Sequence, residues 1–584
     1  MAGGYDRFPT VRVSGHEVLL GYDALVGALE RRVDALGRSG ADRVVLACDS
    51  YPGVRDDEVL GALGSLRPEV LIDTRDLFPE PDELTRRMEP FLTDDRVFGR
   101  MCFGELEDFM DAAALVSARR RVEEARGLVV VCGFGAALVH PGDVLVYCDV
   151  TRWEIQLRYR AGMPNYRCDN GDDDVLRKVK RGYFVEWRLA DRHKARLLGR
   201  ADYVVDTIDT GSPRAVTGSA LADALDVASS RPFRTVPYFD PGVWGGQWMR
   251  ERFGLPGEKP NYAWAFDGVP EENALALAFD NAVVRVPAMD LTLLRPLPLL
   301  GEGVYARYGA EFPIRFDLLD TMGGQNLSLQ VHPTTDYIRR AFGMAYTQDE
   351  SYYILDASED ACVYLGLRED VDPEEMMGAL ELANAGGAPF DAERYVNRIP
   401  ARPHDHFLIP AGTVHCSGAG TMVLEISATP YLFTFKLWDW GRTGLDGRPR
   451  PVHLEHGRQV IRWDRDETWV RRNLVGRARK VEDACGAALV ERTGLHELEP
   501  LETRRYMIEP GARVLLDSRG TVSVLNLVAG EEAVVGSPTG AFEPMPVHYA
   551  ETFVVPAATG PYTVENVSGS DVVLVRAYVR GMEG

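Results

Sequence analysis

Cysteine, positive charge and long apolar runs are all scarce in this 584-residue chain. Its eight cysteines form no CxxC pair, which argues against a disulfide scaffold and a cysteine-based zinc finger. There is no stretch of about 18 apolar residues and no signal-peptide pattern, so we expect a cytoplasmic protein with no membrane partner. Lys and Arg number 65 against 88 Asp and Glu, a net charge of −23. Such a field repels phosphate backbones, and we expect no nucleic-acid partner.

The chain has enough apolar sequence for several cores. It is 45% hydrophobic and 9% aromatic, as in globular proteins, and at about 100–200 residues per domain its length predicts three or four domains. Pro, Gly and aromatic residues cluster over 231–246, which indicates a boundary. We therefore expect domains at 1–232, 233–470 and 471–584.

The first 230 residues alternate between short apolar runs and helical patterns. Alternation of this kind predicts an α/β domain with a parallel sheet covered on both faces. The expected strands are 41–48, 70–73, 128–132, 144–148 and 203–206.

The remainder of the chain is predicted to be mainly β, with a small helical insertion. We expect helices at 335–342 and 372–385. The last 90 residues contain short strands in regular succession, which predict a sandwich or jelly roll. These strands are 504–508, 523–528, 533–535, 551–555, 562–566 and 572–577.

Four side chains in the second half suit a divalent metal. Gln330 and His332 are two residues apart in LSLQVHP, so on a strand they point to one face. Glu350 begins an aromatic strand, where burial is costly unless it is paired or ligating. His415 follows the turn in IPAGTVH, and Glu425 lies ten residues later. An amide oxygen, two imidazoles and a carboxylate would bind Zn²⁺ with an open position for substrate oxygens.

Two further histidines, His404 and His406, alternate just before that turn. They resemble a ligand pair in spacing. Because they lie in a predicted loop, we expect both to face solvent.

Residues 233–584 resemble class I mannose-6-phosphate isomerase, a zinc-dependent cupin enzyme. The resemblance implies a double cupin, a sugar phosphate as small-molecule partner, and one Zn²⁺ per chain held by Gln330, His332, Glu350 and His415. It is carried by motifs in this order: VWGG (243–246), LLG (299–301), FPIRFDLLD (312–320), QVHP (330–333), Glu350, IPAGTVH (409–415), VLE (423–425), FKLWDWGR (435–442) and YAETFVVPA (549–557).

The chain departs from that family at two cationic positions. The family's Lys two residues before the ligand Glu is Gln348 here, and its catalytic Arg is matched by Lys436 if one inserted residue is allowed. Arg442 matches a further Arg of the short bacterial members. Lys and Arg hold anions differently, so the metal site is better supported than the substrate. Glu425 is either the catalytic base or a carboxylate that orients His415.

Residues 1–232 resemble the uridine-kinase branch of P-loop kinases. The likeness lies in VVVCGFGAAL (129–138), in the lid-like stretch 146–160, and in Asp73 and Asp76. The phosphate loop GxxxxGK[ST] is replaced by DSYPGVRDD (49–57), whose carboxylates would oppose a triphosphate. We therefore predict a kinase-like domain that does not transfer phosphoryl groups.

The resemblance implies a metal-dependent aldose–ketose isomerase that works through a cis-enediol, with Glu425, Lys436 and Arg442 as candidate catalytic residues. Two alternatives stay open. One is a non-catalytic sugar- or nucleotide-sensing protein that keeps the metal cupin, and the other is a bifunctional sugar kinase–isomerase. The sequence leaves open the sugar, the oligomeric state, and the choice among zinc, iron and manganese.

Overall fold

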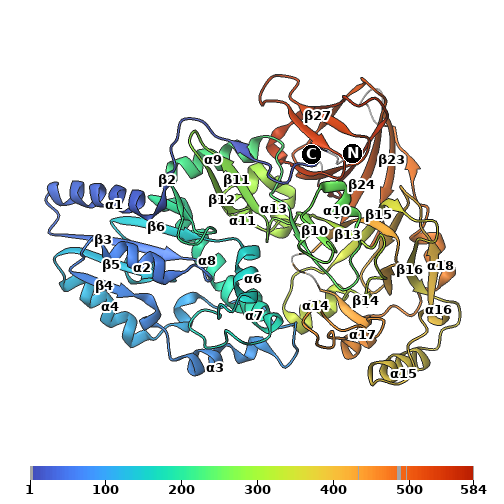
Figure 1. Cartoon of the computed structure of the whole chain (residues 1–584), viewed down its shortest axis with the longest axis horizontal. Helices are drawn as coiled ribbons and strands as arrows, with labels where there is room; N and C mark the ends of the chain where they lie inside the picture. The colour runs from blue at the N-terminus through green and yellow to red at the C-terminus, as the bar shows by residue number, and fades with distance from the viewer. Residues whose placement is uncertain (1–3, 430, 432, 483–487, 495, 583–584) are drawn as a thin grey trace. The chain divides into compact units, whose positions relative to one another are not determined.

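The computed structural model describes residues 4–582 except 430, 432, 483–487 and 495, and its contacts group into two units (Figure 1). Unit 1 comprises Met1–Pro9, Ala228–Asn273 and Arg295–Gly584. Unit 2 comprises Thr10–Val227 and Ala274–Leu294.

Unit 2 is built on a seven-stranded sheet, and its parallel core confirms the predicted α/β layout. Five strands run parallel in the order β4 (Val70–Asp73), β5 (Gly127–Gly133), β3 (Arg43–Ser50), β6 (Val144–Asp149) and β7 (Tyr203–Asp206). Antiparallel strands β8 (Arg214–Thr217) and β2 (Leu19–Leu20) complete one edge. β3 is buried from Val44 to Ser50, as expected for a strand covered on both faces.

The helices of unit 2 connect these strands. They are α1 (Gly21–Arg38), α2 (Asp56–Gly64), α3 (Pro81–Leu92), α4 (Ala112–Glu124), α5 (Ala136–Val139), α6 (Arg152–Arg160), α7 (Val175–Arg181), α8 (Trp187–Leu197) and α9 (Gly218–Ser230).

A segment distant in sequence also groups with unit 2. It contains β11 (Ala274–Ala278), β12 (Val283–Pro287) and α11 (Met289–Leu294), and β11 pairs in parallel with β1 (Val11–Arg12). The buried Lys194 on α8 forms ion pairs with Asp290 of α11 and with Asp149. The predicted boundaries placed 274–294 in the middle domain, because a pairing across 260 residues leaves no local pattern.

The first sandwich of unit 1 consists of two facing sheets. One has the order β18 (His406–Ile409), β15 (Asp349–Ala357), β20 (Thr421–Ala428), β13 (Arg315–Asp320), β10 (Trp264–Gly268) and β9 (Tyr238–Asp240). The other has the order β17 (Val396–Pro400), β16 (Cys362–Leu367), β19 (His415–Ser417), β14 (Leu329–Val331) and β21 (Phe435–Trp438).

Both predicted helices of this half are confirmed, as α14 (Thr335–Phe342) and α15 (Pro373–Asn384). The side chain of Asp372 accepts a hydrogen bond from Glu375 N and Pro373 occupies the first turn, so α15 starts at a well-formed cap. Other helices of unit 1 are α10 (Trp248–Phe253), α12 (Pro296–Leu300), α13 (Glu302–Tyr308), α17 (Leu454–Val460) and α18 (Glu467–Asn473).

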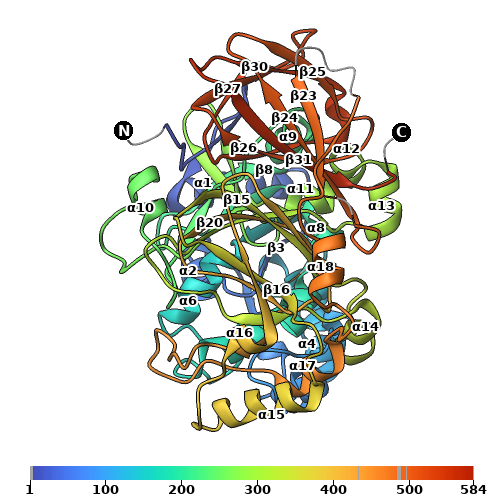
Figure 2. The same ribbon diagram turned by 90° about the vertical axis from the view of Figure 1, so that its right-hand side faces the viewer.

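A second sandwich occupies the carboxyl-terminal part of unit 1 (Figure 2). Its six-stranded sheet has the order β22 (Arg479–Lys480), β23 (Ala488–Gly494), β24 (Leu501–Ile508), β31 (Val572–Val579), β26 (Ser523–Ala529) and β29 (Thr552–Val555). Its four-stranded sheet has the order β25 (Arg513–Asp517), β30 (Pro561–Asn566), β27 (Glu532–Gly536) and β28 (Met545–His548). A shared core includes Tyr506, Phe553 and Tyr562. The predicted terminal strands are confirmed.

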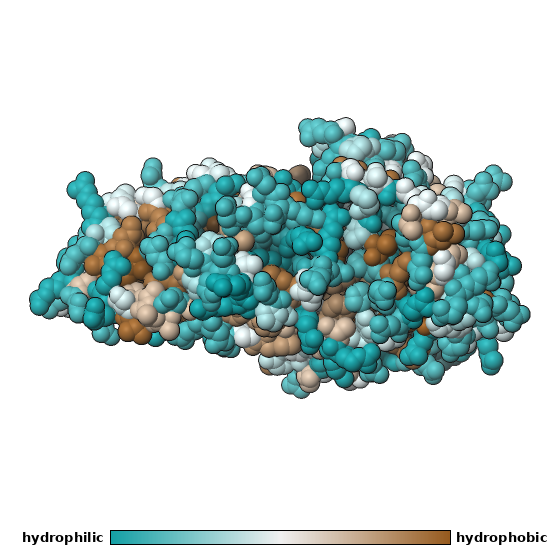
Figure 3. Space-filling view, turned by 90° about the horizontal axis from the view of Figure 1, so that it is seen from below, coloured by the Kyte–Doolittle hydropathy of each residue, from teal (hydrophilic) through white to brown (hydrophobic). Residues whose placement is uncertain are grey.

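The surface carries scattered apolar side chains. The face in Figure 3 is largely hydrophilic, with apolar residues in small separate patches. Among the described residues, none of the helices has both the length and the apolar content needed to cross a bilayer.

The expectation that His406 faces solvent is wrong. His406 belongs to β18, where it pairs with Tyr353, and only 7% of it is exposed. Burial lowers the pKa of His406 to about 3, and neither ring nitrogen has a hydrogen-bond partner among the described residues. His404 is half-buried, and its Nδ1 lies 3.0 Å from the hydroxyl oxygen of Tyr353. A short strand begins where the sequence indicated a loop.

We expect His406 to destabilise the fold in acid. Its folded pKa lies below the unfolded value of about 6.5, so between these values the unfolded chain binds the extra proton. The free energy of unfolding should therefore decrease as the pH is lowered through this window, by at most about 1.4 kcal/mol per pH unit. In urea unfolding at pH 7 and pH 5, His406→Leu should lose less stability on acidification than the wild type. Equal losses in the two chains would contradict this.

Candidate metal centre

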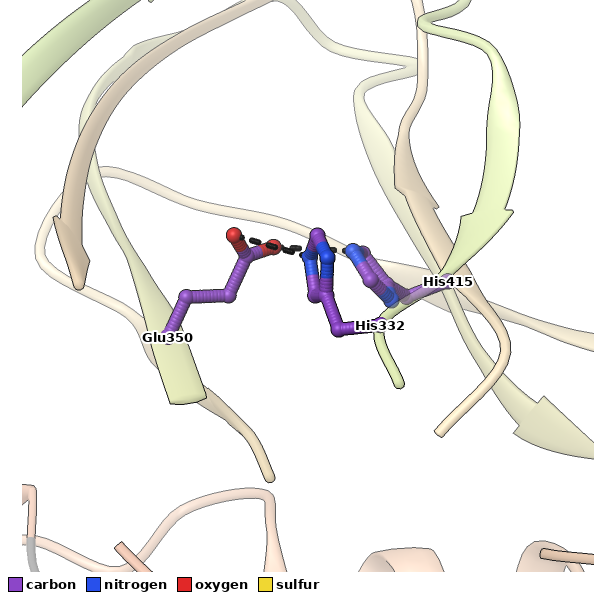
Figure 4. Close-up of side chains that lie close together, drawn as sticks. All are labelled: His332, Glu350 and His415. Carbon is purple, nitrogen blue, oxygen red and sulfur yellow. Dashed lines mark ion pairs between the residues drawn. The ribbon is translucent and has the colours of Figure 1, made fainter. Parts of the chain in front are cut away.

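Three buried side chains converge between the two sheets of the first sandwich (Figure 4). Glu350 comes from β15 of one sheet, whereas His332 directly follows β14 and His415 begins β19 of the other. Glu350 Oε2 lies 3.0 Å from His332 Nε2, and Oε1 lies 2.8 Å from His415 Nε2. All three side chains are fully buried. The distant parts of the chain thus supply one compact donor set.

Backbone carbonyls fix how the two imidazoles face Glu350. His332 Nδ1 lies 2.8 Å from Phe433 O, and His415 Nδ1 lies 2.9 Å from Thr413 O. A carbonyl can only accept, so each Nδ1 carries the hydrogen and each Nε2 of a neutral ring presents a lone pair. His332 Nε2 has no well-formed hydrogen bond among the described residues despite its closeness to Glu350. Lone pairs that face a carboxylate are stabilised by a proton or a metal ion between them, and this donor set fits a divalent metal.

Gln330 completes the group of four ligands predicted from the sequence. It lies opposite His415 in the β14–β19 register, and its Nε2 is 3.2 Å from His415 Nε2. The amide oxygen and nitrogen exchange places by a flip of the side chain. The structure therefore brings Gln330, His332, Glu350 and His415 together.

Charge interactions at the centre favour the ionised carboxylate. Burial alone would raise the pKa of Glu350, but His332 and His415 hold that pKa well below its usual range. Burial likewise opposes protonation of His332, whereas Glu350 brings the net pKa of that ring above its ordinary value. A cation is thus favoured where the three side chains meet.

Gln348 links two carboxylates beside the cluster. Its Nε2 lies 2.8 Å from Glu350 Oε2 and 3.4 Å from Glu425 Oε1, and its Oε1 accepts a hydrogen bond from Phe433 N at 3.0 Å. Burial, and then the charges of Glu350 and Asp317, raise the pKa of Glu425. Because Thr413 O orients His415, Glu425 is not needed for that task.

The two candidate cations differ in their surroundings. Lys436 on β21 is half-buried and lies opposite Gln330 in the strand register. Arg442 binds Asp439 Oδ1 at 2.5 Å and donates to Asn326 O at 2.7 Å. These contacts of Arg442 are those of a structural ion pair that braces the loop after β21.

Sequence reasoning missed the backbone partners of the cluster. The carbonyls of Thr413 and Phe433 determine the histidine tautomers, yet carbonyls occur at every residue and carry no sequence signal. The Gln348 contacts had a weak signal, because Gln348 lies two residues before Glu350, a spacing that in extended backbone puts both side chains on one side.

In unit 2, the segment 49–57 that replaces the phosphate loop begins with a carboxylate that the chain itself binds. Asp49 at the end of β3 accepts hydrogen bonds from Gly135 N at 3.1 Å and Ala137 N at 2.8 Å. His193 Nε2 lies 2.8 Å from the same carboxylate. The Asp49 carboxylate is therefore held by two amides and a histidine of the same unit.

Comparisons with known proteins give two different results, one for residues 21–230 and one for similarity to named enzymes. Residues 21–230 match a family described as a domain of unknown function (DUF8485). The chain is also similar to the probable mannose-6-phosphate isomerase GmuF of Bacillus subtilis (strain 168), with 29% identity over 234 residues, which is 40% of this chain and 69% of that protein. It is 28% identical over 221 residues to the mannose-6-phosphate isomerase of Streptococcus mutans serotype c, covering 38% of this chain and 64% of the relative.

A solved structure of mannose 6-phosphate isomerase from Bacillus subtilis aligns with 60% of this chain and 100% of its own length. The TM-score is 0.48 and the sequence identity 19%.

We expect purified protein to retain about one divalent metal per chain, because four donors meet at a single point. His415→Ala removes one imidazole and should weaken metal binding at least about 100-fold, more than the loss of an outer hydrogen bond does. Plasma mass spectrometry after dialysis measures this, with His404→Ala as a control outside the cluster. Wild-type metal occupancy in the His415→Ala protein would contradict the assignment.

Proposed function

We propose that unit 1 is a metal-dependent aldose–ketose isomerase of the mannose-6-phosphate isomerase type. The observation that carries the proposal is the pair of imidazole lone pairs held against Glu350 by backbone carbonyls. Sequence similarity to proteins named mannose-6-phosphate isomerases supports the reaction class. We further propose that both sandwiches are cupins and that the resident metal is one zinc ion.

The metal would be held by Gln330, His332, Glu350 and His415. When bound, a divalent metal at this place supplies Lewis-acid polarisation of a sugar's carbonyl and hydroxyl oxygens. Glu425 moves a proton between the two adjacent carbons, so that aldose and ketose interconvert through a cis-enediol. Its raised pKa makes the Glu425 carboxylate a stronger base than an exposed glutamate.

Gln348 positions this machinery. By donating to both Glu350 and Glu425 while accepting from Phe433 N, it fixes the distance between a ligand and the base. Lys436 is our candidate for binding negative charge on the substrate. Arg442, tied to Asp439, acts as a brace for the neighbouring loop.

For unit 2, we propose a domain that does not transfer phosphoryl groups. The sequence of segment 49–57, which holds three aspartates and no Lys, supports this, because carboxylates there would oppose a triphosphate.

We expect turnover of mannose 6-phosphate in heavy water to place deuterium on the carbon next to the carbonyl. Glu425→Gln should lower kcat about 10²- to 10⁴-fold, the range for loss of a general base, while metal content stays unchanged. The exposed Glu393→Gln serves as the control. Absence of exchange with all hexose and pentose phosphates would contradict the isomerase proposal.

The sensor alternative is favoured by Gln348 and Lys436, which stand where the isomerase family has Lys and Arg. The double variant Gln348→Lys with Lys436→Arg distinguishes a sensor from an isomerase. In an active isomerase, Lys at 348 has no acceptor for Phe433 N, and we expect kcat/KM to fall about tenfold, as for loss of a buried hydrogen bond. Recovery of turnover from an inert parent would instead favour the sensor. Steady-state kinetics of both chains decides between them.

A further inference from the structure

A cavity of about 360 Å³ lies in unit 1 behind the strand that carries Glu350. Thr347 and Asp349 line it, whereas the alternate residues Gln348 and Glu350 belong to the metal centre. Side chains alternate between the faces of a strand. The same four residues thus form a wall between the metal centre and this cavity.

Three arginines from separate elements line the cavity: Arg307 of α13, Arg339 of α14, and Arg580 after β31. Among the described residues, none of them forms an ion pair with a carboxylate. Arg580 donates to the carbonyls of His496 and Glu497 at 3.1 and 3.0 Å, and carbonyls leave its charge uncompensated. Guanidinium groups that lack a carboxylate partner are suited to a phosphate, which they bind through paired N–H donors.

Three carboxylates line the same cavity: the exposed Glu497, the half-buried Asp349 and the buried Glu499. Asp349 accepts a hydrogen bond from Ala411 N at 2.8 Å, and Glu499 Oε1 accepts one from Ile409 N at 3.1 Å. Each of these two carboxylates is thus fixed by a backbone amide of the segment that precedes His415. Carboxylates such as Asp349 and Glu499 accept hydrogen bonds from hydroxyl groups and repel a second anion beside them.

The aromatic side chains add a third feature. The rings of Tyr308 and Tyr346 meet edge to face, with centroids 5.0 Å apart, in the wall of the cavity. Figure 2 shows α13 and α14 on the same side of the unit. The volume lies within the range of about 300–1,000 Å³ that small-molecule sites occupy.

We propose that this cavity is a second binding site, for a small phosphorylated polyol of the sugar-phosphate class. The phosphate lies at Arg307, Arg339 and Arg580, and the hydroxyl groups lie at Asp349 and Glu499. A bare phosphate satisfies the arginines but not the carboxylates, and an uncharged sugar does the reverse. The site goes beyond the isomerase reaction and does not depend on it.

Occupation of the cavity acts on the metal centre through the chain. Asp349 and Glu499 hold the amides of Ala411 and Ile409, which belong to the segment that leads into His415. Asp349 also directly precedes Glu350. A ligand that orders these carboxylates therefore changes metal affinity, and the metal changes affinity for the ligand by the same factor, typically about 5- to 150-fold.

Calorimetry on the full-length His415→Ala chain tests the site without the metal centre. Mannose 6-phosphate should bind this chain, and mannose and inorganic phosphate should each bind at least about tenfold more weakly. Wild type stripped of metal by a chelator provides a second sample, in case the substitution disturbs folding. Absence of mannose 6-phosphate binding in both samples overturns the proposal, as does inorganic phosphate binding equally tightly.

Arginine variants locate the binding. Arg307→Gln with Arg339→Gln changes two exposed residues and should weaken mannose 6-phosphate binding at least about tenfold, the effect of losing a charged hydrogen bond. Arg340→Gln is the matched control on α14, because Arg340 lies over the Tyr337 ring, outside the cavity lining. Unchanged binding in the double variant overturns the proposal. Failure of the isomerase proposal appears separately, as missing turnover in the metal-loaded wild type.

Discussion

Two hydrogen bonds from imidazole to backbone determine what the first sandwich of unit 1 can do. Phe433 O and Thr413 O each accept from a histidine Nδ1, so both Nε2 atoms present lone pairs to the Glu350 carboxylate. Two imidazole lone pairs and a carboxylate repel one another in a buried, low-dielectric site unless a cation lies among them. The rest of the sandwich holds this arrangement in place, together with Glu425 and the neutral Gln348 that lies between Glu350 and Glu425.

The sandwich can hold the two imidazoles against the carboxylate because the register of its antiparallel strands is fixed. Gln330 and His415 are direct cross-strand partners in one sheet, while Glu350 lies on the facing sheet opposite Ser427. A slip of one residue would turn every ligand to the other face. The same alternation sends Asp349 away from the metal and into a separate cavity, so one strand serves two chemical environments.

The sequence predicted most strands and the four candidate ligands. The features that it did not predict depend on contacts between distant residues. Apolar runs indicated the parallel strands of unit 2 and the terminal strands of unit 1 because strands such as β3 and β31 are buried along almost their whole length. The candidate ligands could be named from the sequence because they lie in short local motifs, and the structure brings them close together. Sequence periodicity could not find the pairing of β1 with β11, which joins residues more than 260 apart. It also could not show that His406 is buried, since solvent exposure there depends on packing against Tyr353.

X-ray absorption at the zinc edge of the full-length protein tests the central claim most directly. Nitrogen and oxygen neighbours at about 2.0–2.2 Å, with the outer-shell pattern of two imidazoles and no sulfur at about 2.3 Å, are the result we predict. A sulfur neighbour, a single imidazole, or protein that binds no metal would contradict it.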